Sequence, residues 1–408
     1  MYLERRFAFR QLVAGLRDGR RRPQIATATV WLAVFAMFAV RLPSFNALEL
    51  ELRRPRRWQP WTGSARAPSA DTIGRVLAQL EPAGMRGLLV TLNRRAWRAK
   101  AIRGRRGETH RVVAVDGHEL WASRARCCTE CQTREVLVSG ARVREYYHRV
   151  VVAQWVGATP PALLDVERVR AGEGEVVAAR RLLARLVATY GRLLDVIVAD
   201  ALYLETPFIN TVLAAGKHFV VVMKQQARTL YQEADDLRAL HAPRLVVTAT
   251  RTTRLWDLAD LTSDRADHPP VRVVWAEEQT RPRRVIGGRT CETTEDKRWI
   301  WVTDLRSAVV TAETIQRWGH ARWDLETRGF NELVTLWHMD HCFRHHPAAI
   351  EILLLVLAAA FLLSYVFYER NLKPAARRYL TRLALAGRLR EDLAGATSSL
   401  WPAVLRSD

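Results

Sequence analysis

Hydrophobic and polar positions divide the chain into a helical part and a part with strand periodicity. Residues 25–52 are expected to form one or two helices, the first strongly apolar. A helical pair follows, its first helix capped by Asp71, with a turn at 81–84. Apolar residues recur with helical spacing at Ile73, Val76, Leu77 and Leu80, then at Met85, Leu88, Leu89 and Leu92. This pair resembles a helix-turn-helix, although helical hairpins that do not bind DNA share its spacing.

From residue 111 the pattern changes to short apolar runs that are typical of strands. Strands are predicted at 111–116, 148–157, 162–169, 195–200 and 217–224, and helices at 173–190 and 205–215. This alternation predicts an α/β fold. Residues 225–298 contain strand-like pieces separated by polar, Pro-containing turns, which predict a mostly β insertion. A strand at 298–305 is expected to resume the core.

The last hundred residues are predicted to be helical. A helix that could be broken near Gly319 is expected from about Thr311 to His341. An apolar helix at 348–367 and a basic amphipathic tail are expected after it. The apolar stretch Ile352–Phe367 approaches the roughly 20 residues that a membrane span needs. Glu351 and Glu369 bracket it, which favours a buried core helix, so no membrane partner is expected. The first 30 residues lack the apolar run of an export signal.

Charge indicates a polyanionic partner. The chain carries 63 basic and 42 acidic residues, a net charge of +21. Most of this excess lies in residues 1–110, which hold 22 basic and 7 acidic residues. A basic N-terminal part ahead of a nearly balanced body predicts a nucleic-acid-binding region followed by a catalytic region.

Three acidic residues are candidates for metal-dependent chemistry. Asp116 and Asp200 each follow an apolar strand, and Glu326 lies within the predicted helix. Two strand ends in one sheet can lie side by side, and a helical Glu can complete a site for two divalent ions that act on a phosphodiester. Oxygen ligands favour Mg²⁺ or Mn²⁺. The alternative is that each acid is a helix cap or part of a surface ion pair.

These acids resemble those of insertion-sequence transposases of the DDE class, which have a ribonuclease H-like core. The likeness is greatest to a cut-and-paste subgroup marked by Tyr-x2-Arg-x3-Glu-x6-Lys, with a β-rich insertion before that motif. Asp116-Gly117 resembles the first motif, Asp200 with Tyr203 the second, and Arg322 with Glu326 the third. The resemblance covers about residues 111–370.

The resemblance implies an α/β fold with a ribonuclease H-like catalytic core, interrupted by the β insertion and preceded by a helical DNA-binding region. Its expected segments are 1–108 for DNA binding, 109–224 and 299–370 for the core, 225–298 for the insertion and 371–408 for the tail. Asp116, Asp200 and Glu326 would be catalytic and hold Mg²⁺ or Mn²⁺. The expected DNA contacts are Arg322, Lys224, Arg328 and Asn331.

Two positions depart from the subgroup motif. Gly319 stands at the Tyr position and Leu333 at the Lys position, both of which would contact DNA phosphates. Arg317, His320 or Arg328 could replace them. Arg322 either holds a phosphate, orients Glu326, or forms an ordinary ion pair with this residue one helical turn away. Lys224 could reach a phosphate or be a solvated strand end.

Cysteine and histidine form a second group of candidates. The five cysteines, three of them at 127–131, do not suit a secreted disulfide framework. Cys128 and Cys131 have the Cys-x2-Cys spacing of zinc ligands, and His148 is a third candidate, with reduced structural thiols as the alternative. Four histidines surround Cys342, where a polar helix end is favoured over a metal or DNA site: His338, His341, His345 and His346.

The resemblance implies a DNA transposase. It would bind the terminal inverted repeats of its element, cleave a phosphodiester at each end by two-metal catalysis, and join the 3′ ends to target DNA. A homodimer is expected to hold the two ends, in the bacterial cytoplasm at the nucleoid. The alternatives are a metal-dependent nuclease without strand transfer, a non-catalytic DNA-binding protein derived from a transposase, and a membrane-associated protein.

Overall fold

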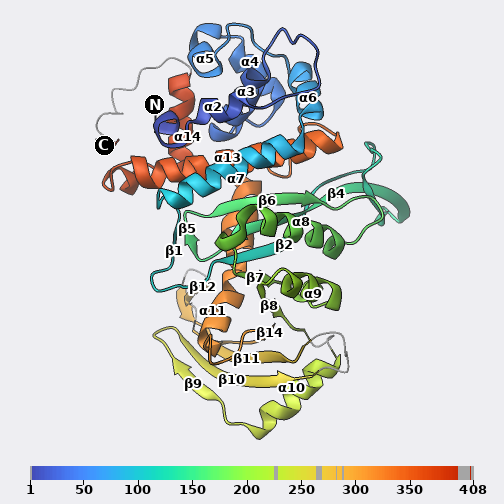
Figure 1. Cartoon of the computed structure of the whole chain (residues 1–408), viewed down its shortest axis with the longest axis vertical. Helices are drawn as coiled ribbons and strands as arrows, with labels where there is room; N and C mark the ends of the chain where they lie inside the picture. The colour runs from blue at the N-terminus through green and yellow to red at the C-terminus, as the bar shows by residue number, and fades with distance from the viewer. Residues whose placement is uncertain are drawn as a thin grey trace. The chain divides into compact units, whose positions relative to one another are not determined.

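The computed structural model describes residues 2–224, 228–262, 269–281, 283–286, 289–393 and Leu405. It combines an N-terminal helical region with a large mixed β-sheet (Figure 1). The chain divides into two compact units. The first contains Met1–Gly107, Gly117–Leu182 and Glu326–Asp408, and the second contains Glu108–Asp116 and Leu183–Leu325. Strand β2 (Val112–Ser123) has residues in both.

The first unit begins with the predicted helices. They are α1 (Tyr2–Phe7), α2 (Phe9–Ala14), α3 (Thr27–Ala39), α4 (Phe45–Leu52), α5 (Pro55–Thr62), α6 (Ala70–Gln79) and α7 (Pro82–Arg98). The helices expected within 25–52 and the helical pair are confirmed. The predicted cap at Asp71 is wrong, because the Ser69 side chain accepts the hydrogen bond from the Thr72 amide and Asp71 lies in the first turn.

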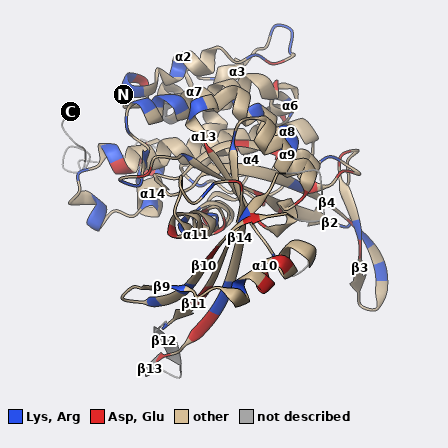
Figure 2. Cartoon of the chain, turned by 60° about the horizontal axis from the view of Figure 1, so that its bottom comes forward, with Lys and Arg blue, Asp and Glu red and all other residues tan. Residues whose placement is uncertain are grey.

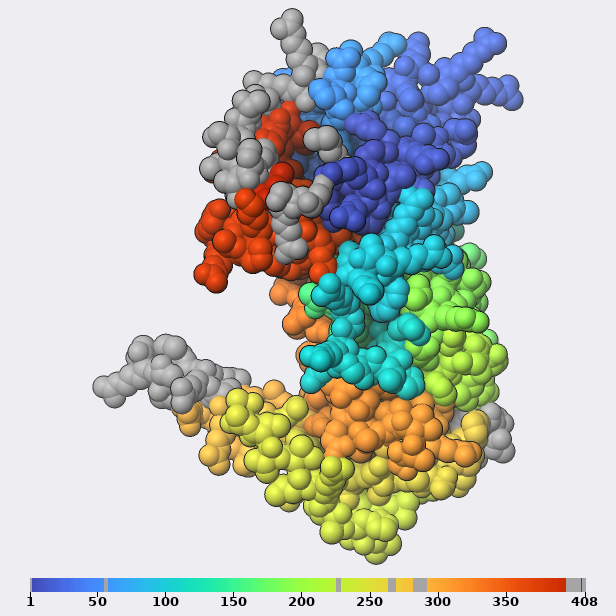
Figure 3. Space-filling model, turned by 60° about the vertical axis from the view of Figure 1, so that its left-hand side comes forward, coloured from blue at the N-terminus to red at the C-terminus, as the bar shows by residue number. Residues whose placement is uncertain are grey.

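Helix α13 (Pro347–Asn371) is the central helix of the first unit. It contacts α3, α6 and α7. Its length and composition would allow it to cross a membrane, yet 89% of its most apolar 18-residue stretch is buried within the structure. The prediction of a buried helix at 348–367 is therefore confirmed. Figure 3 shows the C-terminal segment against the N-terminal helices, in agreement with contacts of α13 with α1 and of α14 (Arg382–Leu393) with α5.

Buried ion pairs join α7 and α13 to strand β6 (Ala162–Arg168). Arg86 of α7 lies 3.0 Å from Asp165 and also pairs with Glu351 of α13. Arg168 of β6 lies 3.0 Å from the same Glu351. Glu351, expected to bracket an apolar helix, is thus neutralised inside the first unit. Removing one partner of such a pair leaves an uncompensated buried charge, so these contacts fix the helices against β6.

A long β-hairpin and several short elements complete the first unit. Strands β3 (Gln132–Val138) and β4 (Ala141–Trp155) form the hairpin, and β4 also pairs with β6, all antiparallel. Basic residues mark the hairpin in Figure 2. The other elements are β1 (Arg103–Gly104), β5 (Ala158–Thr159), α8 (Glu175–Tyr190), which reaches the second unit, α12 (Asn331–Trp337) and a 3₁₀ turn at Ala376–Arg378.

The second unit contains three parallel strands. Strand β7 (Val196–Ala199) pairs with the start of β2 and with β8 (His218–Val222). Helix α9 (Thr206–Ala214) connects β7 to β8 and packs on β8, and short 3₁₀ turns lie at Gly191–Leu193 and Ala201–Tyr203. The strands predicted at 195–200 and 217–224 and the helix at 205–215 are confirmed in type and place.

Antiparallel strands dominate the insertion. They are β9 (Arg244–Val247), β10 (Arg251–Leu261), β11 (Val271–Thr280), β12 (Arg283–Ile286), β13 (Arg289–Glu292) and β14 (Glu295–Thr303). Strand β14 pairs antiparallel with both β11 and β8. Helix α10 (Arg228–Leu240), which the pattern did not predict, lies against β10 (Figure 1). Its apolar side is narrow, with Leu230 and Ala234 buried one helical turn apart.

The helix expected from Thr311 to His341 is divided in the structure. Helix α11 (Ala312–Ala321) begins after Thr311, whose side chain accepts a hydrogen bond from the Thr314 amide. A π-helical turn follows at Leu325–Phe330, and then α12. His338 ends α12 with φ of +58°, a left-handed conformation that stops an α-helix. A continuous helix to His341 is therefore wrong, whereas the alternative of a break near Gly319 agrees with the end of α11 at Ala321. Periodicity does not reveal the π-turn or the left-handed residue.

Candidate functional site

Asp116 and Asp200 each lie two residues beyond the last paired position of two neighbouring parallel strands. In the register of β2 and β7, Ala114 is paired with Val198, and each acid lies two residues further along. Neighbouring strands are about 4.8 Å apart. The two carboxylates therefore start from adjacent backbone positions of the second unit. This supports the prediction that the acids that follow these two apolar runs lie side by side.

The two acids differ in their backbone setting. Asp200 follows the last residue of β7, as expected, and its carboxylate accepts a hydrogen bond of 2.9 Å from the Leu202 amide. Asp116 lies within β2, so the prediction that this strand ends at Asp116 is wrong. The strand continues to Ser123, and β4 is its other neighbour in the sheet.

Arg322 holds the Asp116 carboxylate. Its Nη1 atom donates a hydrogen bond of 2.7 Å to Oδ2 of Asp116. Arg322 is the residue at the C-terminal end of α11, and its side chain is only 8% exposed. A hydrogen-bonded ion pair at this depth is shielded from solvent, so it is stronger than a surface pair. This contact with the first acid was not among the roles expected for Arg322, which were contact with a phosphate or with Glu326.

Glu326 lies in the π-helical turn of the first unit, where it is half-buried. Phe330 of the same turn stacks on His118, with ring centroids 4.5 Å apart. Burial lowers the pKa of His118, which favours the neutral ring. His118 is two residues after Asp116 in β2, and residues at this spacing share a face of a strand. The turn that carries Glu326 is thus held on β2 by an aromatic contact.

Gly117 allows a second acidic residue to approach β2. A Cβ atom at this position would overlap the carboxyl group of Glu175, which lies at the start of α8. Glu175 is itself 3.5 Å from Arg149 of β4. The glycine of the Asp-Gly motif thus lies in close contact with the Glu175 side chain within the first unit.

The comparison with known proteins agrees with this arrangement. A family model described as a transposase DDE domain matches residues 108–363. The chain belongs to the DDE transposase family. Membership implies a phosphoryl-transfer enzyme that uses a divalent metal, binds DNA and carries out transposition. The search of curated proteins finds no match.

In this DDE transposase, close packing explains the two departures from the subgroup motif, Gly319 and Leu333. Gly319 in α11 packs so closely on β14 that a Cβ atom would overlap the indole ring of Trp301. Trp301 is buried, so the space of a larger side chain is already filled. Leu333 in α12 is fully buried in the first unit. Both positions serve packing in this chain, and neither is available to hold a phosphate.

The residues expected to replace them differ in their contacts. Arg317 lies 2.7 Å from Glu108, and His320 lies 2.7 Å from Glu278. Burial would raise the pKa of the Glu278 carboxyl, but hydrogen bonds from His320 and Gln316 and the charge of Arg251 together hold its pKa below the usual value. Arg317 and His320 are thus engaged within the second unit, whereas Arg328 is exposed.

The remaining DNA-contact predictions fall on exposed residues. Lys224 follows β8 in the second unit, and Asn331 begins α12 in the first unit. The structure places both on the surface, where a phosphate could reach them. Their role stays a prediction.

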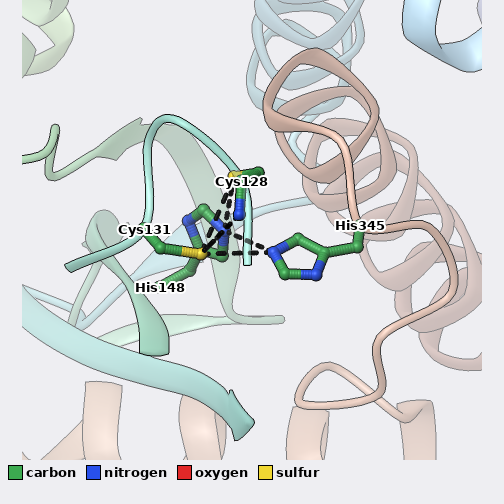
Figure 4. A group of neighbouring side chains, drawn as sticks. All are labelled: Cys128, Cys131, His148 and His345. Carbon is green, nitrogen blue, oxygen red and sulfur yellow. Dashed lines mark hydrogen bonds between the residues drawn. The ribbon is translucent and has the colours of Figure 1, made fainter. Parts of the chain in front are cut away.

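The Cys and His candidates form a compact group in the first unit. Cys128, Cys131, His148 and His345 each direct one ligand atom into a cluster in which all four atoms lie within 4.8 Å of one another (Figure 4). Three of these residues were predicted. His345 was interpreted as part of a polar helix end, which is wrong, because the chain leaves its helical course at His338 and returns His345 to the cysteines. No sequence spacing connects residues this far apart.

Proposed function

We propose that the chain is a DNA transposase of the cut-and-paste subgroup marked by the Tyr-Arg-Glu-Lys motif, with a ribonuclease H-like core. The strand pairings support this core. β6 pairs with β4, β4 neighbours β2, and the start of β2 is parallel to β7, which is parallel to β8. The insertion, which precedes the segment with Arg322 and Glu326, supports the subgroup. The segments expected from the sequence, from the DNA-binding residues 1–108 to the tail 371–408, are proposed as its functional parts.

The observation that carries the proposal is the register of Asp116 and Asp200. Asp116 and Asp200 follow adjacent parallel strands in the same register. Together with Glu326, they would form an oxygen-rich donor set. Such a set fits Mg²⁺ or Mn²⁺. Asp116, Asp200 and Glu326 would hold the ions. When bound, the ions would activate the attacking hydroxyl and stabilise the leaving oxygen of a phosphodiester.

Arg322 would act on the reaction through Asp116. The guanidinium fixes the direction of the carboxylate by donating a hydrogen bond to it. This makes Arg322 a positioning residue for the first acid. A further contact of Arg322 with DNA phosphate, as the motif implies, would follow binding of the DNA.

Double-stranded DNA is the proposed partner. The net positive charge is concentrated in residues 1–110, which form the helices α1 to α7, and we assign the terminal inverted repeats to this region. Arg328, Asn331 and Lys224 would contact the backbone near the cleaved end. Because phosphate contacts release counterions, the binding constant should fall steeply as salt rises. The two ends would be held by a homodimer at the bacterial nucleoid.

Cleavage of the flanking DNA tests the proposal. The substrate is a duplex containing the boundary of the element that encodes this chain, incubated with Mg²⁺ or Mn²⁺. We expect the wild type to nick at the repeat boundary, Asp200→Asn to lose this activity, and Asp236→Asn, an exposed acid of α10, to keep it. Binding without cleavage would favour the non-catalytic alternative, and nicking without joined product would favour the nuclease.

A further inference from the structure

We propose that Cys128, Cys131, His148 and His345 bind a structural zinc ion. The two cysteines lie in the segment between β2 and β3, His148 is in β4, and His345 precedes α13. Segments of the first unit that are distant in sequence thus converge on one point (Figure 4). This site is separate from the three acids of the proposed active site and shares no ligand with them.

The separations between the ligand atoms fit a tetrahedral zinc site. With Zn–S of about 2.3 Å and Zn–N of about 2.05 Å, tetrahedral angles require about 3.8 Å between sulfurs, 3.3 Å between nitrogens and 3.6 Å between unlike atoms. The two Sγ atoms lie 3.7 Å apart, and the two Nε2 atoms 3.4 Å apart. The Nε2 atom of His148 lies 3.4 Å from each sulfur, and that of His345 lies 3.2 Å from Cys131 Sγ.

A disulfide bond or a purely hydrogen-bonded group fits the cluster less well than a metal ion. A disulfide bond needs about 2.05 Å between sulfurs, far less than the 3.7 Å separation of Cys128 and Cys131. In a hydrogen-bonded group, each neutral imidazole Nε2 would have at most one proton to donate. Each thiol adds one weak S–H donor, but here all four atoms turn toward one common point at the separations of a tetrahedral metal site. A central cation satisfies all four at once.

The surroundings are those of a closed structural site. Cys131 is 8% exposed and His148 is 3% exposed. Trp121 of β2 packs edge-on against both imidazole rings, with centroid distances of 4.5 Å to His345 and 5.2 Å to His148. The Cys128 amide also donates a hydrogen bond of 3.3 Å to Cys131 Sγ. Four protein ligands leave no position for water or substrate, and two thiolates with two imidazoles favour zinc.

The ion would fix the base of the β3–β4 hairpin. The register that pairs Gln132 with Tyr147 places Cys131 opposite His148 at the end of this hairpin. His345 adds the segment between α12 and α13 to the same point. Zinc would therefore fasten the hairpin, with its exposed Arg142, to the segment that follows the turn of Glu326.

Metal analysis of the full chain, purified without chelator under reducing conditions, tests the site. We expect about one zinc ion per wild-type chain, and at least a tenfold loss in Cys131→Ser and in His345→Ala. Cys127→Ser and His346→Ala are matched controls, because each alters a neighbour outside the cluster, and both should keep the ion. Equal zinc in all five proteins, or none in the wild type after incubation with zinc, would overturn the proposal.

Cobalt spectroscopy keeps the proposal testable if a ligand variant fails to fold. Replacement of zinc by Co²⁺ in the wild-type chain should give the intense visible bands of a tetrahedral ion, together with thiolate charge-transfer absorption. The weak spectrum of an octahedral, oxygen-bound Co²⁺ would contradict the assigned ligands. DNA cleavage is not needed for either readout, so failure of this site and failure of the transposase proposal are distinguishable.

Discussion

Arg322 and Asp116 form an ion pair 206 residues apart in sequence, with 2.7 Å between Nη1 and Oδ2. Arg322 belongs to the motif of the third acid, whereas Asp116 is the first acid. The pair therefore links two motifs that the sequence presents as separate. It also gives Arg322 a charged partner in the structure without DNA.

Replacement of Arg322 should reduce activity through metal binding. We expect Arg322→Gln to lower cleavage by about 10–100-fold, the usual cost of losing a residue that orients a metal ligand. Higher Mg²⁺ should recover part of the loss. Arg322→Lys keeps the charge and should recover activity only partly, because it lacks the planar fork of Arg. A cleavage titration with Mg²⁺ checks this, and an unchanged Mg²⁺ dependence in Arg322→Gln would rule out the positioning role.

Asp116→Asn should separate cleavage from DNA binding. The substitution keeps the shape of the side chain but removes the charge that would hold the metal, so cleavage should fall below detection. End binding should persist, because its phosphate contacts are assigned to the N-terminal helices. The free energy of unfolding should fall by about 1–3 kcal/mol, since Arg322 loses its charged partner. Gel-shift and melting measurements check these outcomes; joint loss of binding and folding would make Asp116 structural.

Gly319→Ala should destabilise the protein. The added Cβ would overlap buried Trp301, and overpacking of this kind costs about 1–3 kcal/mol. Gly387→Ala is the matched control, because this exposed glycine of α14 has open space around it and Ala favours helix by up to about 1 kcal/mol. The melting temperature should fall in Gly319→Ala and rise slightly in Gly387→Ala. Gly319→Tyr would restore the Tyr of the motif, but its larger side chain should destabilise the protein further.

The Glu278 carboxyl should make stability depend on acid pH. Its pKa is held below the usual 4.5, so the ionised form stabilises the fold, and this contribution is present above 4.5 and lost as pH falls through the lower folded-state pKa. Denaturant unfolding from neutral to acidic pH should show a smaller loss of unfolding free energy in Glu278→Gln than in the wild type. Parallel curves for the two proteins would contradict this.

The sequence predicted those elements whose pattern is local. Strand 195–200, helix 205–215 and the buried helix at 348–367 follow from apolar runs with clear periodicity, and each is found in the structure. The narrow apolar side of α10 and the π-turn at Leu325–Phe330 leave no such pattern. For this reason they were missed.

The candidate active site and the zinc site could also be predicted only as far as local sequence patterns allow. The chemistry of Asp116, Asp200 and Glu326 could be proposed from their contexts and the motif resemblance, and three zinc ligands from a Cys-x2-Cys spacing and a nearby His. The Asp116–Arg322 contact and the fourth ligand, His345, depend on how distant segments pack. One sequence carries no spacing that reveals such contacts.

Strand transfer from a pre-cut end tests the central claim most directly. The substrate is a duplex that ends in the 3′-hydroxyl of the terminal repeat, mixed with a target plasmid and Mg²⁺. The account predicts that the wild type and the surface variant Glu391→Gln join the end to the target, and that Glu326→Gln does not. Joining by Glu326→Gln at the wild-type rate, or equal joining with and without a divalent metal, would contradict it.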